Sequence, residues 1–127
     1  MTLLFDAEHR VPHLGDLEAR VMDVVWGAPA QTVREIIALL GDEHAYTTMA
    51  TVLRNLERKG FVTAERERTT TRYLAAQTRC ERAAGLMALA MRHSRQQESC
   101  ANQFADAVGE DEARMLFTAL QRRLGLG

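Results

Sequence analysis

The segment Tyr46–Lys59 carries the side chains that are best suited to recognising another molecule. At the period of an α-helix its apolar residues fall at i, i+3, i+4 and i+7 and form one stripe, made of Met49, Val52, Leu53 and Leu56. The opposite side combines hydroxyl, amide and guanidinium groups, on Thr47, Thr48, Thr51, Arg54, Asn55 and Arg58. Threonine is a poor helix former, so helix propensity does not explain this polar side.

Short polar side chains allow a helix to approach the edges of base pairs closely. Threonine methyl groups contact thymine, and arginine binds guanine or a phosphate. The predicted base-reading residues are therefore Thr47, Thr48, Thr51, Arg54 and Asn55. The predicted contacts from this helix to the DNA backbone are Tyr46 and Arg58. A solvated helix face that binds nothing is the alternative that this segment alone leaves open.

Two further helices are predicted before this segment. Asp16–Trp26 has apolar residues at helical spacing and ends at a Gly-Ala-Pro break. Thr32 and Glu35 form the capping-box pattern at the start of the second helix, and Gly41 is its expected end. A short turn then leads to the helix at Tyr46, so the order is that of a helix-turn-helix.

After Gly60 the pattern changes from helical to extended. Residues 61–66 and 71–75 are rich in β-forming residues, and the polar stretch 67–70 separates them, which predicts a β-hairpin. A hairpin directly after a recognition helix is typical of a wing. Its basic side chains, Arg66, Arg68 and Arg72, are predicted to reach the sugar–phosphate backbone.

Basic side chains are concentrated in the same part of the chain. The formal net charge is −1, but residues 44–82 hold 8 basic and 4 acidic side chains, whereas residues 1–43 hold 3 basic and 8 acidic ones. A basic patch confined to one segment is the electrostatic footprint expected of a phosphate-binding surface.

Length and composition indicate ordinary globular material. A hydrophobic content of 46% over 127 residues fits one compact domain, or one small domain with an appended element. No apolar run approaches the ~20 residues that span a bilayer, and the N-terminus lacks the pattern of a signal peptide. We therefore expect a cytoplasmic protein without a membrane partner, in which residues 1–13 form a flexible N-terminal arm.

Residues 78–127 return to helical patterns, with helices predicted from Thr78, over about Ser99–Val108, and from Gly109 or Glu110. Their apolar residues exceed what so short a chain buries beside a separate N-terminal core, which favours a dimerisation region. The predicted dimerisation residues are Leu86, Met87, Ala90, Met91, Phe104, Met115, Leu116 and Leu120. The alternative is a monomer whose C-terminal helices fold back on the N-terminal core.

The predicted fold is mainly α with a small β-hairpin wing. It comprises a winged helix-turn-helix DNA-binding domain over residues 14–77 and a helical dimerisation region over residues 78–127. A dimer presents two recognition helices about one DNA turn apart, which suits a palindromic site. The sequence contains no glycine-rich phosphate loop and no recognisable Ser/His/Asp set, so neither an enzymatic activity nor a cofactor is expected.

The sequence resembles the BlaI/MecI/CopY family of penicillinase repressors over about residues 14–124. The matching motifs are Leu14-Gly15-Asp16-Leu17-Glu18, Val21-Met22-Asp23-Val24-Val25-Trp26, Thr32-Val33-Arg34-Glu35-Ile36, Tyr46-Thr47-Thr48, Val52-Leu53-Arg54-Asn55-Leu56 and Lys59-Gly60. The resemblance implies a homodimeric winged-helix repressor that binds dyad operators in double-stranded DNA with TACA/TGTA-like half-sites. By position it assigns base reading to Thr47, Thr48, Thr51 and Arg54, and the wing contacts to Arg66, Arg68 and Arg72.

Two parts of the family pattern are missing. Members that respond to a membrane-protease sensor are cut at an Asn-Phe bond, and the matching stretch here is Asn102-Gln103-Phe104. The copper-responsive branch carries paired cysteines near its C-terminus, and residues 120–127 contain no cysteine. The resemblance therefore leaves the inducing signal undefined.

A metal- or redox-responsive regulator is the alternative function. Cys80, Cys100 and His93 lie in or near the predicted dimerisation helices, where a convergence of these groups would bind a metal or respond to oxidation. Their spacing matches no typical metal site, so free buried thiols and a surface histidine are the simpler interpretation. No metal site is predicted.

Overall fold

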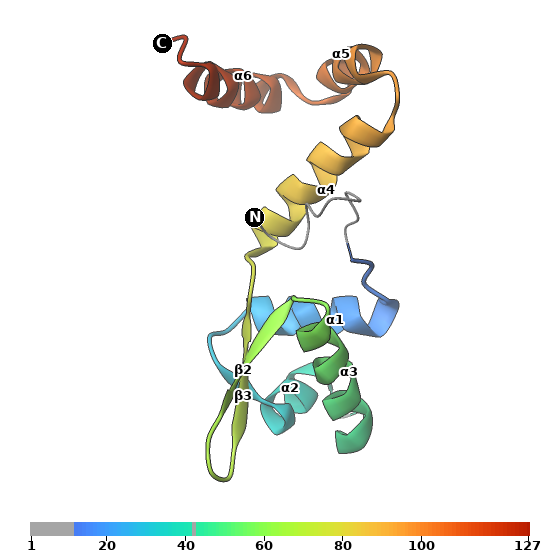
Figure 1. Ribbon diagram of the computed structural model, residues 1–127, viewed down its shortest axis with the longest axis vertical. Coiled ribbons are helices and arrows are strands. Elements are labelled where there is room, and N and C mark those ends of the chain that lie inside the picture. Colours follow the sequence, from blue (N-terminus) through green and yellow to red (C-terminus); the bar gives the residue numbers. More distant parts are fainter. Residues whose placement is uncertain (1–11, 42) are drawn as a thin grey trace. The chain divides into compact units, whose positions relative to one another are not determined.

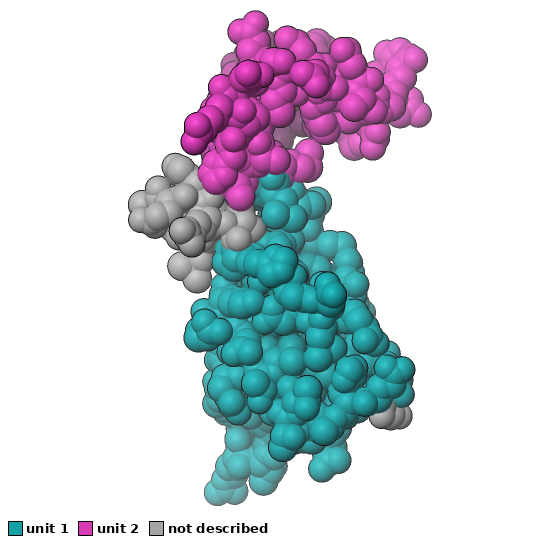
Figure 2. Space-filling model, turned by 90° about the vertical axis from the view of Figure 1, so that its right-hand side faces the viewer, with its two compact units in different colours: residues 1–86 teal, residues 87–127 magenta. Residues whose placement is uncertain are grey.

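The computed structural model describes residues 12–41 and 43–127 (Figure 1). The chain divides into two compact units, the first ending at Leu86 and the second beginning at Met87 (Figure 2). Most of the predicted flexible arm, residues 1–11, lies outside the described ranges. The limit between the units falls inside a helix, C-terminal to the predicted domain limit at residue 77.

The first unit is built from helices packed against a small sheet (Figure 1). Its elements are α1 (Asp16–Trp26), β1 (Gln31–Thr32), α2 (Val33–Leu40), α3 (Tyr46–Arg58), β2 (Val62–Arg66) and β3 (Thr71–Ala75), followed by the start of α4 (Arg79–His93). The three N-terminal helices and the hairpin occur in the predicted order, which confirms the winged helix-turn-helix.

Local signals in the sequence determine where α2 begins and ends. The Thr32 hydroxyl accepts a hydrogen bond from the Glu35 N–H at 3.2 Å, and the Glu35 carboxylate accepts one from the Thr32 N–H at 2.8 Å. This is the predicted capping box, which satisfies two donors that the first turn of a helix leaves open. At the other end Gly41 adopts φ +102°, the left-handed conformation that favours glycine.

The sheet has three antiparallel strands in the order β1-β3-β2. β1 was not predicted, because two residues show no periodicity and this strand exists only through its pairing with β3. The wing begins at Val62 rather than at the predicted Phe61. The Phe61 N–H donates to the Leu56 carbonyl at 2.9 Å, which closes the end of α3 and places the Phe61 ring in the core.

One hydrophobic core lies between the helices and the sheet of the first unit. It consists of Val21, Met22, Val25, Val33, Ile36, Met49, Leu53, Leu56, Phe61, Val62 and Tyr73. Phe61, Val62 and Tyr73 of the hairpin therefore face inward, and Trp26 packs against this cluster.

The first turns of α4 pack on the winged helix. The Arg82 guanidinium lies over the Phe61 ring, 5.0 Å from its centroid, and donates to the Pro12 carbonyl at 3.0 Å. Burial lowers the pKa of Arg82. α4 begins at the helix start predicted at Thr78, with a capping box in which the Thr78 hydroxyl accepts from the Glu81 N–H at 2.9 Å and the Glu81 carboxylate accepts from the Thr78 N–H at 2.8 Å.

The second unit contains the rest of α4 together with α5 (Gln97–Ala107) and α6 (Glu110–Leu124). α5 starts at Gln97, earlier than the predicted Ser99. Residues 87–127 are all described, and none of their side chains is buried. The large apolar side chains exposed in this unit are Met87, Met91, Phe104, Met115, Phe117, Leu120, Leu124 and Leu126.

None of the helices in the described ranges has both the length and the apolar character needed to cross a membrane.

Candidate nucleic-acid interface

α3 has one buried side and one polar, exposed side. Met49, Leu53 and Leu56 have no exposed surface, and Val52 packs against the same core. On the other side the exposed residues are Tyr46, Thr47, Thr48, Thr51, Arg54 and Arg58, and Asn55 is half-buried beside them. The predicted polar residues therefore lie together on the side of α3 that faces away from the core.

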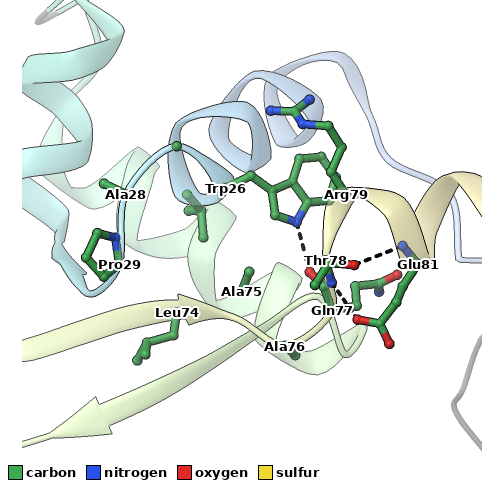
Figure 3. A pocket seen from close by; sticks show the side chains of 12 residues that line it. Trp26, Ala28, Pro29, Leu74, Ala75, Ala76, Gln77, Thr78, Arg79 and Glu81 are labelled. Atoms are coloured by element: carbon green, nitrogen blue, oxygen red, sulfur yellow. Dashed lines mark hydrogen bonds between the residues drawn. The ribbon is translucent and has the colours of Figure 1, made fainter.

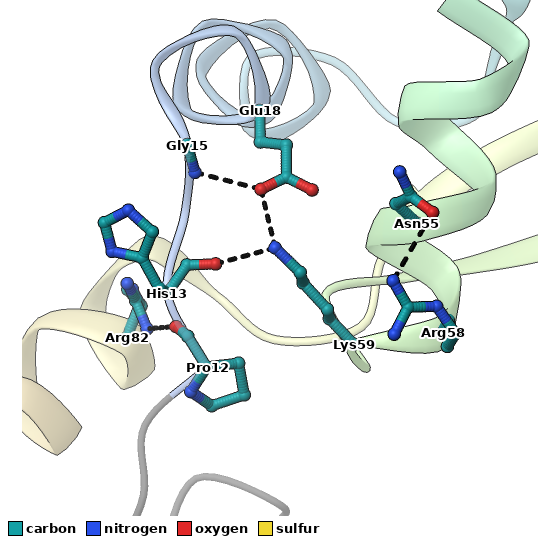
Figure 4. Close-up of polar contacts among 8 residues, drawn as sticks. All are labelled: Pro12, His13, Gly15, Glu18, Asn55, Arg58, Lys59 and Arg82. Atoms are coloured by element: carbon teal, nitrogen blue, oxygen red, sulfur yellow. Dashed lines mark hydrogen bonds and ion pairs between the residues drawn. The ribbon is translucent and has the colours of Figure 1, made fainter.

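The C-terminal end of α3 is held firmly on α1. The Lys59 ammonium donates to the His13 carbonyl at 2.9 Å and to the Glu18 carboxylate at 2.7 Å (Figure 4). Burial raises the pKa of Glu18, but hydrogen bonds from Lys59 and from the Gly15 N–H outweigh this effect and hold that pKa below its ordinary value. The carboxylate is therefore ionised at neutral pH and keeps its bond to Lys59.

Two predicted base-reading side chains make hydrogen bonds within α3. The Thr51 hydroxyl donates to the Thr47 carbonyl at 3.0 Å, which leaves its lone pairs and its methyl group available. Arg58 donates to the Asn55 side-chain oxygen at 3.4 Å (Figure 4). Asparagine reads adenine with its oxygen and nitrogen together, so Asn55 reads adenine only if Arg58 releases that oxygen.

Two of the predicted wing arginines are engaged with carboxylates. Arg66 makes two hydrogen bonds to Glu57 on α3, at 2.9 and 3.1 Å. Arg72 lies 3.3 Å from Glu35 on α2. The hydrogen bonds from Arg66 lower the pKa of Glu57, whereas the pKa of Glu35 is lowered first by the Thr32 N–H and then by Arg72. Both acids are thus charged at neutral pH and compete with phosphate for these arginines.

Arg54 and Arg68 differ from this pair. Both are exposed, and neither forms an ion pair with any residue in the described ranges. Arg54 lies on the outer side of α3, and Arg68 lies in the turn that connects β2 to β3. Their guanidinium groups can therefore meet DNA without first breaking a salt bridge.

Arg34 belongs to the same surface but was not predicted. It lies in the first turn of α2, and its guanidinium carbon sits 5.4 Å from the centroid of the Tyr46 ring at the start of α3. A distance below about 6 Å is typical of a cation–π contact. The only hint in the sequence is that Arg34 is one of 3 basic residues in the acidic stretch 1–43, because the contact to Tyr46 depends on how the helices pack.

The chain that carries this surface is similar to known proteins. The model of the penicillinase repressor family matches residues 14–122. The transcriptional regulator BlaI of Mycobacterium tuberculosis is 38% identical over 117 residues, which cover 87% of this chain and 85% of that protein. The chain belongs to the penicillinase repressor family. It is a transcriptional regulator of winged-helix fold, and the resemblance to BlaI/MecI/CopY proteins is confirmed.

Among solved structures the likenesses are weaker. A homodimeric winged helix-turn-helix DNA-binding domain from Mycobacterium bovis is 26% identical, with a TM-score of 0.46 over 65% of this chain and 70% of that one. FabT of Streptococcus pneumoniae, in complex with DNA, is 22% identical, with a TM-score of 0.48 over 96% of this chain and 80% of that one. Both TM-scores lie below 0.5.

Cys80, Cys100 and His93, which were considered as sensor residues, all lie within the described ranges. Cys80 is exposed and Cys100 is half-buried, which contradicts the expectation of buried thiols. Within the described ranges, no group of three or more His, Cys, Asp or Glu side chains is arranged to hold a metal ion. Nothing in the part of this repressor-family protein that the structure describes favours the metal- or redox-responsive alternative.

A hollow of about 570 Å³ lies beside Trp26, between the loop after α1 and the segment that leads into α4 (Figure 3). Two of its polar side chains, those of Trp26 and Arg79, already serve the fold. The Trp26 N–H donates to the Gln77 carbonyl at 2.9 Å, and Arg79 lies over the indole ring at 4.8 Å while it pairs with Asp23 at 2.9 Å. These contacts hold the start of α4 against α1.

Proposed function

We propose that this protein is a homodimeric, sequence-specific repressor that binds a dyad operator in double-stranded DNA. In this proposal α3 reads base edges through Thr47, Thr48, Thr51, Arg54 and Asn55. The DNA backbone is held by Tyr46, Arg58, Arg66, Arg68 and Arg72. The observation that supports it best is the exposed threonine and arginine side of α3, on a helix whose opposite side is anchored in the core.

The homodimer is proposed from the apolar surface of the second unit. Phe104, Leu120 and Leu124 expose 43%, 57% and 67% of their surface. Exposed apolar side chains in one contiguous region mark a protein–protein interface, and a second copy of the chain is the partner that symmetry offers most simply. Family membership adds the proposal of TACA/TGTA-like half-sites, one for each α3 helix of the dimer.

Fluorescence anisotropy with a labelled TACA/TGTA dyad and a scrambled duplex, at several salt concentrations, tests this function. We expect the wild-type protein to prefer the dyad and to bind it as a dimer. Arg54→Ala should weaken binding to the dyad by about 1–3 kcal/mol and reduce the preference over the scrambled duplex. Arg68→Ala should weaken both duplexes alike and flatten the salt dependence.

Arg20→Ala is the matched control, because Arg20 is exposed on α1 and its removal changes the net charge equally. Equal binding of the wild type to both duplexes would refute recognition of this operator. Wild-type behaviour of Arg54→Ala would instead refute the assignment of the base-reading side of α3.

A further inference from the structure

We propose that Arg34 and Tyr46 form a phosphate clamp that extends the DNA-binding surface from α3 to the first turn of α2. This inference rests on the DNA-binding function proposed above. Arg34 would contact a backbone phosphate, and Tyr46 would position it. No part of the predicted interface included α2.

The contact with the Tyr46 ring prepares Arg34 for phosphate. A guanidinium group has five N–H donors, all in its plane. The Arg34 guanidinium carbon lies over the Tyr46 ring, 5.4 Å from its centroid, and a cation–π contact of this kind uses none of the N–H donors. Bidentate hydrogen bonding to phosphate uses the donors at the edge of the group. The ring therefore orients Arg34 without consuming the groups that bind the ligand.

The other arginines of the surface are less well prepared. Arg66 and Arg72 use donors on Glu57 and Glu35. Arg34 forms no ion pair with any residue in the described ranges. The capping box of α2 also fixes the backbone on which Arg34 lies. Among these three, only Arg34 combines an orienting contact with unpaired donors.

The position of Arg34 in the helix-turn-helix also suits a contact with the DNA backbone. In a helix-turn-helix the second helix enters the major groove while the helix before it crosses the phosphate backbone. Here α2 is that preceding helix, and Tyr46 is the first residue of α3. A cation beside Tyr46 therefore lies where the backbone borders the groove. A phosphate contact at this point adds affinity and fixes orientation without reading sequence.

Anisotropy titrations of the dyad and the scrambled duplex over a range of salt concentrations test the clamp. Arg34→Ala should weaken both duplexes by about tenfold and reduce the slope of log K against log salt by about 0.9. Arg34→Lys should restore the slope but not the full affinity, because lysine keeps the charge and loses the planar fork. Arg20→Ala should leave both quantities close to those of the wild type.

The role of Tyr46 is tested in the same assay by comparing two substitutions. Tyr46→Phe keeps the ring, and Tyr46→Leu removes it. The difference in affinity between them should be clear when Arg34 is present and should vanish in the Arg34→Ala background. Melting temperatures of all variants check that each one is folded.

Two results would overturn the clamp: an unchanged salt slope for Arg34→Ala, or a loss confined to the dyad, which would mean that Arg34 reads bases. The slope is measurable on the scrambled duplex alone. Failure of the clamp is therefore distinguishable from failure of sequence-specific binding, which appears as equal affinity of the wild type for the two duplexes.

Discussion

At the scale of single residues, the arginines of the candidate interface differ in what holds them. Arg34 lies over an aromatic ring, Arg66 and Arg72 are paired with carboxylates, and Arg54 and Arg68 have no ion pair within the described ranges. An exposed ion pair contributes only ~0–1 kcal/mol, so phosphate can displace the carboxylate. The loss of the ion pair still reduces what each paired arginine contributes to the free energy of DNA binding.

Release of Arg66 from Glu57 should therefore strengthen DNA binding. Glu57→Gln removes the competing charge, and we expect both the dyad and the scrambled duplex to bind roughly two- to fivefold more tightly. The salt slope should steepen by up to about 0.9, because Arg66 becomes available to one more phosphate. Anisotropy at several salt concentrations measures both effects.

Glu65→Gln is the matched control for that experiment. Glu65 is exposed on β2 and forms no ion pair in the described part of the chain, so its removal changes the net charge equally without releasing an arginine. If Glu65→Gln and Glu57→Gln strengthened binding to the same extent, general electrostatics rather than release of Arg66 would explain the gain.

The Glu18–Lys59 contact predicts a pH dependence of stability. The pKa of Glu18 is lowered in the folded state, so its contribution is present above the ordinary glutamate pKa of about 4.3 and is lost as the pH falls through the lower folded value. Glu18→Gln should lower the free energy of unfolding by about 1 kcal/mol at pH 7. This difference from the wild type should shrink below about pH 4. Urea unfolding across this range measures it, and a constant difference down to pH 3 would contradict the assignment.

At the scale of elements, helix ends depend on a few backbone conformations. Gly41 ends α2 at φ +102°, where a Cβ atom would have open space but a residue with an L side chain would be strained. Gly41→Ala should lower the free energy of unfolding by about 1–2 kcal/mol. Gly27→Ala is the matched control, because Gly27 also caps a helix but has φ −80°, which any residue adopts. Thermal or urea unfolding compares the two, and equal losses would show that the strain at Gly41 is not the cause.

At the scale of the whole molecule, dimerisation decides whether two recognition helices act together. Light scattering should give a mass near twice 14.2 kDa. Leu120→Asp should shift the protein toward monomer, because a carboxylate is costly in an apolar interface. The affinity for DNA should fall as the fraction of dimer falls, while circular dichroism should show that the winged helix stays folded.

Thr118→Asp is the control for the dimer, because Thr118 lies on nearly the opposite side of α6 from Leu120. It should leave the mass unchanged. A monomeric wild type would exclude the proposed dimer, and a shift to monomer by Thr118→Asp alone would show that the other side of α6 forms the interface.

The sequence by itself determined the helices and the hairpin of this protein, and the orientation of α3. The signals that determine these elements act between residues a few positions apart, so they can be recognised without knowledge of the fold. They are the helix starts at Thr32 and Thr78, the stop at Gly41 and the helical spacing of Met49 and Leu53. The same spacing shows which side of α3 faces outward. This is why the winged helix-turn-helix and the exposed polar side of α3 were predictable.

Only the tertiary structure decided how the charges of the surface are engaged. Arg72 and Glu35 are 37 positions apart, and the contact of Arg34 with Tyr46 requires α2 and α3 to pack together. β1 likewise exists only because it pairs with β3. No local pattern encodes such contacts, because their partners become neighbours only after the core has formed.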